Sequence, residues 1–210
     1  MDGALFSDRL DAGRRLAELY DGPRDEVVVL GIARGGIPVG YPIATDLDAV
    51  IDVVTARKLP IPWSPEMGFG AIAPDGSMVL NEELMPSLGL SPEEIDSIAK
   101  QVLAEVRRRE LVYRGGRAAA AVAGRNVILV DDGLATGYTM IASIEMMKNQ
   151  GAAYLTVAVP VSPADTARRV EAMTDRLLVI HEACTYSFAV ASFYRDFHDM
   201  EDGEVLEYLD

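Results

Sequence analysis

The stretch VILVDDGLATGYT, Val127 to Thr139, decides the fold of this chain. It opens with a continuous apolar run, which is typical of a parallel strand that is buried on both faces. Two acidic residues and a loop of small residues follow, and a helical pattern begins after them. Because open α/β sheets bind ligands at the carboxyl ends of their strands, this order predicts a ligand site directly after the strand.

The residue types in this loop suit a phosphorylated sugar. Carboxylates such as Asp131 and Asp132 accept hydrogen bonds from vicinal hydroxyls. Thr136, Gly137 and Thr139 can present N–H groups and hydroxyls at the start of the next helix, where unpaired donors and the helix dipole favour an anion. Hydroxyls on one side and a phosphate on the other predict a ribose 5-phosphate. By itself, Asp-Asp-Gly is equally typical of a polar turn.

A second apolar run, Val27 to Ile32, ends in the glycine-rich segment GIARGGIPVG, Gly31 to Gly40. Its spacing matches neither the dinucleotide fingerprint G-x-G-x-x-G nor a Walker A loop. The segment places Arg34 beside two glycines, which let a backbone approach a ligand closely, and arginine is a bidentate donor for phosphate oxygens. The alternative is a tight turn between a strand and a helix.

A third apolar run, Ile51 to Thr55, is followed by the cations Arg57 and Lys58. We expect them to close this strand at the same end of the sheet as the two loops above. In isolation, such a pair is as often a solvated surface feature. Three strand ends with groups suited to phosphate or ribose favour a shared site.

These three segments together resemble the type I phosphoribosyltransferases, most closely a group of small bacterial and archaeal members. The resemblance implies an enzyme that binds 5-phosphoribosyl 1-pyrophosphate (PRPP) and Mg²⁺. Such an enzyme transfers ribose 5-phosphate to a nitrogenous small-molecule acceptor, such as a purine or another base, and releases pyrophosphate. It also implies a strained or cis peptide around Ala33-Arg34, and a homodimer.

The resemblance assigns roles residue by residue, with Asp131, Asp132 and Arg34 as the catalytic residues. The ribose and its 5-phosphate are assigned to Asp131, Asp132, Ala135, Thr136, Gly137, Tyr138 and Thr139. The pyrophosphate is assigned to Arg34, Gly35, Gly36, Arg57, Lys58 and Arg114. Mg²⁺ is assigned to Asp131 and Asp132, through water or the ribose hydroxyls.

One position departs from part of the family. Ala135 stands where the 6-oxopurine enzymes carry an aspartate that acts as general acid/base near the purine N7. This argues against hypoxanthine or guanine as the acceptor. Adenine-type enzymes use a loop glutamate, but Glu66, Glu82 and Glu110 match that position poorly. The acceptor is therefore open. The alternatives are a non-catalytic PRPP or nucleotide sensor and an unrelated sugar-phosphate-binding protein such as an isomerase.

Alternating strands and helices predict an α/β fold, with a doubly wound, mainly parallel five-stranded sheet and flanking helices in a single domain, 1–210. Within it, we expect residues 59–117 to form an insertion that serves as a flexible lid. This insertion holds a hairpin around Asp75-Gly76 and a helix from Ser91 to about Val112, after which Arg114 and Arg117 reach the pyrophosphate. Residues 181–210 should form a small hood.

Four local expectations concern side chains. Ser7 should cap an N-terminal helix over 4–20. Trp63, Met67 and Phe69 should form a local hydrophobic cluster, which is favoured over stacking on a base. The histidines should be structural or on the surface. The tail carries the aromatics Tyr186, Phe188, Phe193, Tyr194, Phe197 and Tyr208. Of these, Phe193, Tyr194 and Phe197 should serve in packing rather than in catalysis.

Composition excludes several classes of protein. The net charge of −14 over 210 residues argues against nucleic-acid binding as the main activity, because that needs a basic surface. A single cysteine, Cys184, excludes an internal disulfide framework and a CxxC metal site. No apolar run approaches the roughly 20 residues that cross a bilayer, and the first residues do not form a signal peptide. These features predict a cytoplasmic protein that binds no membrane.

Overall fold

Five parallel strands form the central sheet of the computed structural model, which describes residues 4–184 and 188–209. In spatial order they are β2 (Val50–Val54), β1 (Val27–Ile32), β6 (Asn126–Val130), β7 (Tyr154–Pro163) and β8 (Arg176–Ala183). The predicted doubly wound sheet is confirmed. The strand order reverses at β1, which lies between β2 and β6, so the loops that follow β1 and β6 border the switch point where such sheets bind ligands.

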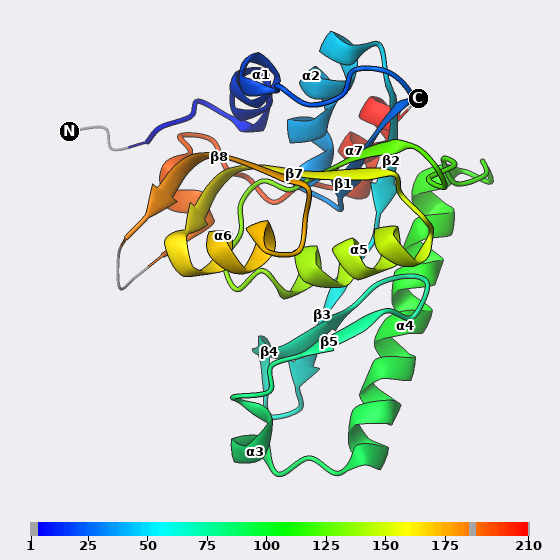
Figure 1. Cartoon of the computed structure of the whole chain (residues 1–210). Helices are drawn as coiled ribbons and strands as arrows, with labels where there is room; N and C mark the ends of the chain where they lie inside the picture. Colours follow the sequence, from blue (N-terminus) through cyan, green and yellow to red (C-terminus); the bar gives the residue numbers. More distant parts are fainter. Residues whose placement is uncertain (1–3, 185–187, 210) are drawn as a thin grey trace.

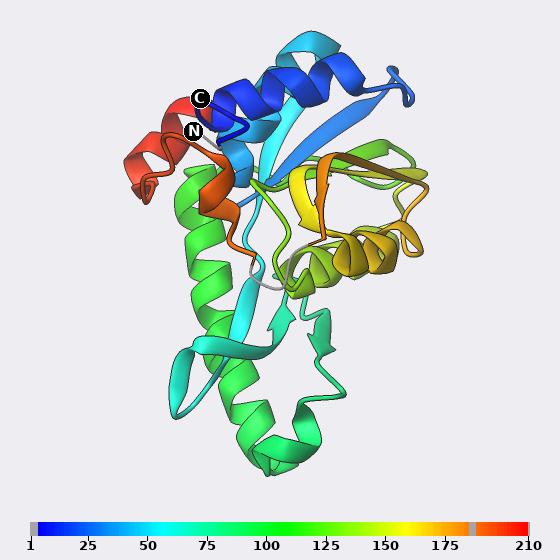
Figure 2. The ribbon, with the colours of Figure 1, turned by 90° about the vertical axis from the view of Figure 1, so that its left-hand side faces the viewer.

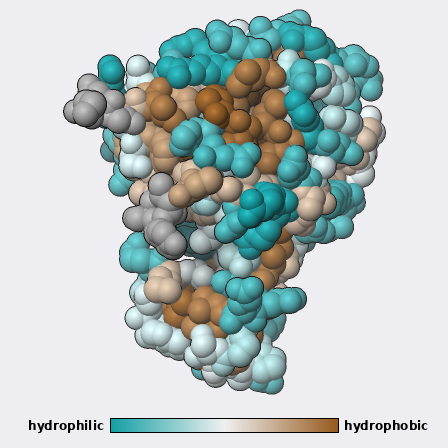
Figure 3. Space-filling view, turned by 60° about the vertical axis from the view of Figure 1, so that its left-hand side comes forward, coloured by the Kyte–Doolittle hydropathy of each residue, from teal (hydrophilic) through white to brown (hydrophobic). Residues whose placement is uncertain are grey.

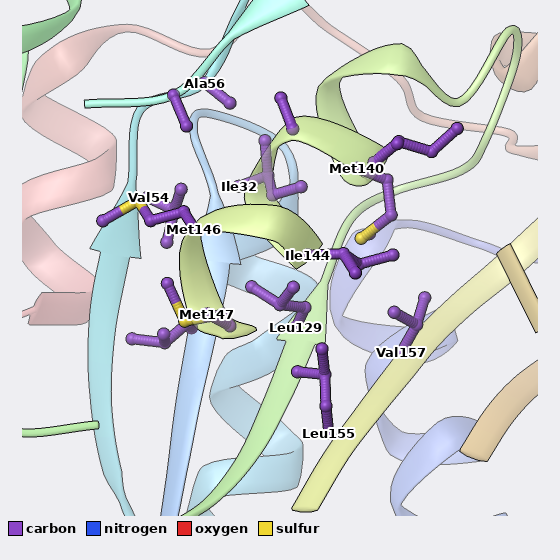
Figure 4. Packing of buried hydrophobic residues seen from close by; sticks show 14 of the residues in the cluster. Ile32, Val54, Ala56, Leu129, Met140, Ile144, Met146, Met147, Leu155 and Val157 are labelled. Carbon is purple, nitrogen blue, oxygen red and sulfur yellow. The ribbon is translucent and has the colours of Figure 1, made fainter. Parts of the chain in front are cut away.

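Helices cover both faces of this sheet (Figure 1). α1 (Arg9–Leu19) and α2 (Gly36–Leu47) lie on one face, and α5 (Tyr138–Asn149) and α6 (Ala164–Glu171) lie on the other. Figure 4 shows how the side chains of α5 meet the strands: Met140, Ile144 and Met147 pack on Leu129, Leu155 and Val157. Burial on both faces explains why the strands read as continuous apolar runs.

A second lobe extends from the core between β2 and β6 (Figure 2). It consists of an antiparallel sheet of β3 (Arg57–Ile61), β4 (Ser64–Ile72) and β5 (Met78–Leu80), with α3 (Met85–Leu88) and α4 (Pro92–Arg114). The lobe has its own apolar core, where Leu59, Ile61, Phe69 and Ile72 meet Ala99, Val102 and Val106 of α4. The Asp75-Gly76 turn lies where the sequence predicts it. So does the start of α4, where Ser91 and Glu94 form a capping box.

Some local predictions are wrong. α1 begins at Arg9 with Asp8 as its N-cap, since the Asp8 side chain accepts a hydrogen bond from the Asp11 amide, and Ser7 lies outside the helix. Phe69 is buried as expected, but Trp63 and Met67 are 64% and 54% exposed at the β3–β4 hairpin and form no cluster with it. Trp63 lies in the turn between β3 and β4, and Met67 lies in the exposed first half of β4, outside the lobe core.

The C-terminal segment returns to the core as a short 3-10 helix (Val190–Phe193) and α7 (Asp202–Leu209). A parallel bridge joins Phe6 to Tyr194, and the rings of Phe188, Phe193, Tyr194 and Phe197 pack together and on Phe6. This confirms that Phe193, Tyr194 and Phe197 pack, whereas Tyr186 lies outside the described residues. Within residues 4–184 and 188–209, no helix has the length and apolar character needed to cross a membrane.

The surface changes character between the two lobes. Figure 3 shows hydrophobic side chains gathered on the upper core and a second hydrophobic patch on the lower lobe, with a strongly hydrophilic cluster between them. The junction of core and lobe is therefore polar where it meets solvent on this face.

Candidate functional site

The loops after β1 and β6 touch each other at the carboxyl end of the sheet. A Cβ atom at Gly35 would lie 1.9 Å from Oδ2 of Asp132, and one at Gly36 would lie 2.3 Å from the carbonyl oxygen of Val130. Only glycine permits so close an approach. The Arg34 loop and the Asp131-Asp132 pair, which the sequence identifies separately, are therefore neighbours. The Ala33-Arg34 peptide is cis, as the resemblance implies.

In each of the Asp131 and Asp132 carboxylates, one oxygen accepts a hydrogen bond. Oδ1 of Asp131 accepts a hydrogen bond from the Asp132 amide at 2.9 Å. Oδ2 of Asp132 accepts one from Nε of Arg9, also at 2.9 Å. Within the described part of the chain, the second oxygen of each carboxylate has no hydrogen-bond partner. An oxygen of this kind on each carboxylate suits a hydroxyl donor.

Burial governs the ionisation of this pair. It raises the pKa of Asp131 well above its usual range, and the adjacent Asp132 carboxylate raises that pKa further. Burial also raises the pKa of Asp132, against the opposing charge of Arg9. A ligand that donates hydrogen bonds or brings positive charge would favour the ionised forms. Without such a ligand, burial disfavours the ionised forms of the two carboxylates.

The loop between β6 and α5 is held from behind by the neighbouring strand and helix. The Leu134 amide donates to the carbonyl of Val161 at the end of β7, at 2.9 Å. From α6, Thr166 Oγ1 donates to the carbonyl of Ala135 at 3.0 Å, and the Arg169 guanidinium donates to the carbonyl of Thr136. These contacts engage the Leu134 amide and the carbonyls of Ala135 and Thr136, so β7 and α6 hold the loop in place.

The start of α5 is shaped as an anion site. Gly137 caps the helix with a left-handed backbone, φ +79°, and the first helical bond runs from the Ile141 amide to the Gly137 carbonyl at 2.9 Å. Helix geometry therefore leaves the amides of Tyr138 and Thr139 without carbonyl partners inside the helix. These donors and the positive end of the helix dipole together favour a phosphate.

The predicted cations lie at different distances from these loops. Arg34 lies in the β1–α2 loop, and its Nη1 is 3.7 Å from Oδ1 of Asp202 at the start of α7. The expectation that Arg57 and Lys58 close β2 is wrong, because β2 ends at Val54 and both residues begin β3 of the lobe. Arg57 pairs with Glu105 of α4, and Lys58 Nζ donates to the carbonyl of Glu66 at 2.9 Å.

Arg57 nevertheless stays close to the site along the chain. The Ala33 amide donates to the carbonyl of Val54 at 2.8 Å, so the end of β2 adjoins the Arg34 loop. Three residues of chain span at most about 10 Å. The proline-rich segment after Lys58 hid the strand from sequence analysis, since proline is tolerated only on edge strands, and β3 is an edge strand.

Arg114 lies in a different environment from the one expected. Its Nε is 3.2 Å from both carboxylate oxygens of Asp52 in the middle of β2, and its Nη1 is 2.7 Å from Glu110. Its Nη2 donates to the Val53 carbonyl at 3.0 Å. The side chain is only 14% exposed and joins α4 to the sheet. Its predicted contact with pyrophosphate would require this ion pair to open.

Two residues at the site carry no signal in the sequence. Arg9 reaches Asp132 from α1 across 123 residues of chain. Tyr194, in the tail, donates its hydroxyl to the carbonyl of Asp132 at 2.6 Å, and burial raises the pKa of this tyrosine. Contacts between segments so distant in sequence follow from the topology, which single-sequence patterns do not reveal.

The donor set fits a Mg²⁺ ion that the substrate helps to hold. No group of three or more His, Cys, Asp or Glu side chains within residues 4–184 and 188–209 could hold a metal alone. The open oxygens of Asp131 and Asp132 offer two ligands, and Mg²⁺ commonly binds one or two carboxylates together with waters and substrate phosphates.

Comparison with known proteins gives a consistent picture. The family model described as "Phosphoribosyl transferase domain" matches residues 7–197. Two curated proteins of Mycobacterium tuberculosis strains, each named "Putative phosphoribosyl transferase", are 39% identical over 207 residues, which is 98% of this chain and 46% of theirs. The chain thus spans about half the length of the curated relatives it matches.

Solved structures agree on the fold. The crystal structure of TT1426 from Thermus thermophilus superposes with a TM-score of 0.80 at 34% identity, covering 97% of each chain. The AQ2163 protein of Aquifex aeolicus is similar at a TM-score of 0.51 and 12% identity, over 82% of this chain and 73% of that chain, which supports the fold alone.

Proposed function

This chain belongs to the phosphoribosyl transferase domain family, and on that premise we propose that it binds PRPP with Mg²⁺ and transfers ribose 5-phosphate to a nitrogenous acceptor, releasing pyrophosphate. One observation carries the proposal. The Gly35-Gly36 backbone lies against Asp132 and the end of β6, so the arginine loop meets the acidic pair, and the chain runs from that pair into the N-terminus of α5. A cytoplasmic location and a homodimer belong to the same proposal.

Each part of PRPP has a proposed partner. The amides and hydroxyls of Thr136, Gly137, Tyr138 and Thr139, together with the Ala135 backbone, hold the 5-phosphate. The open oxygens of Asp131 and Asp132 accept hydrogen bonds from the ribose hydroxyls. The pyrophosphate lies on Arg34, Gly35 and Gly36, within reach of Arg57 and Lys58, and the predicted role of Arg114 depends on release of its ion pair with Asp52.

The reaction breaks the bond between the anomeric carbon and the pyrophosphate oxygen and forms a bond to an acceptor nitrogen. Positive charge develops on the ribose ring, beside the carboxylates of Asp131 and Asp132, while negative charge grows on the leaving group beside Arg34. Such fixed charges stabilise a transition state because they need no reorganisation. When bound, Mg²⁺ supplies charge neutralisation for the pyrophosphate.

The second candidate is a PRPP or nucleotide sensor without turnover, and Ala135 favours it. This residue gives the loop no acid or base at the place where some relatives carry one, and its carbonyl is held by Thr166. The two candidates share the binding site and differ in the chemical step.

Incubation with PRPP, Mg²⁺ and a panel of bases separates the possibilities, with pyrophosphate release as the measurement. Release with one base supports the transferase. Tight PRPP binding by calorimetry without release across the panel supports the sensor. Failure to bind PRPP in the presence of Mg²⁺ eliminates both.

Replacing Gly137 with alanine should weaken PRPP binding about tenfold. A non-glycine residue in the left-handed region costs about 1–2 kcal/mol of stability. The affinity falls because the loop that binds the phosphate is displaced, and a loss of about 1.4 kcal/mol in binding corresponds to tenfold. The new Cβ would also lie 2.7 Å from Cγ2 of Thr166, so the phosphate loop must shift. Calorimetric titration with PRPP and Mg²⁺ measures the effect.

Gly151 provides a matched control for this variant. It follows the other end of α5, has φ +78°, and a Cβ there would meet no atom within 4 Å. Gly151→Ala therefore carries the same backbone strain away from the site. We expect both variants to lose thermal stability and only Gly137→Ala to lose affinity; equal affinities would remove the 5-phosphate from this loop.

A further inference from the structure

Arg9 is a buried arginine of α1 that lies behind the site and contacts Asp132 within it. It is the first residue of α1, and its side chain is 10% exposed. Nε donates to Oδ2 of Asp132 at 2.9 Å, and Nη1 donates to the carbonyl of His198 at 3.0 Å. The guanidinium carbon lies 4.0 Å from the centre of the Phe197 ring. Two separate segments, the loop after β6 and the tail, thus determine where this guanidinium lies.

These contacts leave the Asp132 carboxylate one orientation. Its Oδ2 lies against Gly35 and is held by Arg9, whose Nε is itself 3.1 Å from the position of a Gly35 Cβ. Its backbone carbonyl is held by the Tyr194 hydroxyl at 2.6 Å. Among the described residues, no hydrogen bond reaches its Oδ1. Side chains locked in this way by a supporting layer are the ones that bind with defined geometry.

A structural role alone explains the arrangement less well. The buried pair between Arg114 and Asp52 joins α4 to β2, and the exposed pair between Arg176 and Asp21 joins β8 to the segment after α1. Neither of these carboxylates lies in the loops at the carboxyl ends of β1 and β6. Arg9 instead engages one oxygen of the carboxylate that follows β6 and leaves the other free.

We propose that Arg9 is a positioning residue that orients Asp132, so that the free Oδ1 meets a ribose hydroxyl of the substrate. This inference rests on the proposed function, because it takes PRPP as the ligand. Arg9 does not contact the substrate in this arrangement; it acts through Asp132. Asp132 without Arg9 can rotate, so part of the binding energy is then used to order it.

The test is calorimetric binding of PRPP with Mg²⁺ to wild type, Arg9→Gln, Asp132→Asn and the double variant. Loss of a residue that orients a ligating group typically costs about 10–100-fold, and we expect a loss in that range for Arg9→Gln. If Arg9 acts through Asp132, the double variant should bind no more weakly than Asp132→Asn alone, because coupled residues are not additive.

Arg15 gives the control on the same helix. It forms an exposed ion pair with Asp11 and is 46% exposed, so Arg15→Gln should change affinity by no more than about twofold, as surface substitutions do. Thermal unfolding of every variant shows which remain folded. Arg9→Lys keeps the charge and tests the same contact in case Arg9→Gln does not fold.

The outcomes distinguish failure of the proposed function from failure of the positioning role of Arg9. If wild type binds no PRPP, the proposed function fails and this inference fails with it. If wild type binds and folded Arg9→Gln or Arg9→Lys binds as Arg15→Gln does, the inference alone is overturned. Additive losses in the double variant would also overturn it, because Arg9 would then act independently of Asp132.

Discussion

Replacing Gly36 with alanine will lower the free energy of unfolding by about 3 kcal/mol, the upper part of the range for overpacked positions. The added Cβ would lie 2.3 Å from the carbonyl oxygen of Val130 and 3.1 Å from Cα of Asp131. Both are backbone atoms at the end of β6, so no side-chain rotation can relieve the contact. α2 must move away from the sheet, and the Arg34 loop moves with it. PRPP binding should be lost together with stability.

Urea unfolding at neutral pH measures the first effect and calorimetry the second. Gly203→Ala is the control, because a Cβ there would meet no atom within 4 Å and the residue lies in α7. Alanine is favoured over glycine inside a helix by roughly 0.5–1 kcal/mol, so this variant should be unchanged or slightly more stable. A Gly36→Ala protein as stable as wild type would mean that the two loops are not in the contact described here.

The features that the sequence predicts well are local. The apolar runs Val27 to Ile32 and Val127 to Val130 become β1 and most of β6, because parallel strands buried on both faces need continuous apolar side chains. The ligand loops follow directly from those strands. Their contact through Gly35 and Gly36 then brings the arginine loop and the acidic pair together.

The features that the sequence misses depend on distant partners. Arg9 lies in an ordinary amphipathic pattern, and only the return of the tail past α1 shows that it meets Asp132 and His198. Strand β3 and the first part of β4 are hidden for a different reason. Pro60 and Pro65 lower the strand signal, but β3 pairs with one neighbour only, so a missing amide is tolerated.

The environment of Arg114 was also missed because it depends on a tertiary contact. The sequence places Arg114 at the end of a long helix and predicts that it reaches the pyrophosphate. The partner that holds it, Asp52, lies 62 residues earlier in the middle of an apolar strand. A buried carboxylate is costly unless it is paired, so an aspartate in a buried strand predicts a cation close to Asp52. That signal was present in the run VIDVV, Val50–Val54, but it did not identify which arginine would supply the charge.

Replacing Tyr113 with alanine will lower the free energy of unfolding by about 4 kcal/mol, as expected for removal of a buried aromatic ring. Tyr113 is fully buried where the end of α4 meets α2, β2 and α7, among Ile37, Val53 and Val205. Its hydroxyl donates to Oδ1 of Asp202 at 2.6 Å. Tyr113→Phe keeps the ring and should lose only about 1 kcal/mol, the worth of one hydrogen bond. Denaturant unfolding of the three proteins measures both losses.

The comparison with Tyr113→Phe should also depend on pH. Burial, and then the hydrogen bond to Asp202, raise the pKa of Tyr113 to about 12 from a usual value of 10.0. Because the folded-state pKa is the higher one, the unfolded chain loses this proton first as pH rises. The stabilisation is complete below about pH 10 and is lost as pH rises towards 12. Tyr113→Phe has no such proton, and the other tyrosines are common to both proteins. The advantage of wild type over Tyr113→Phe should therefore shrink between about pH 10 and pH 12, and a constant difference across that interval would show that the Tyr113 hydroxyl is not buried against Asp202.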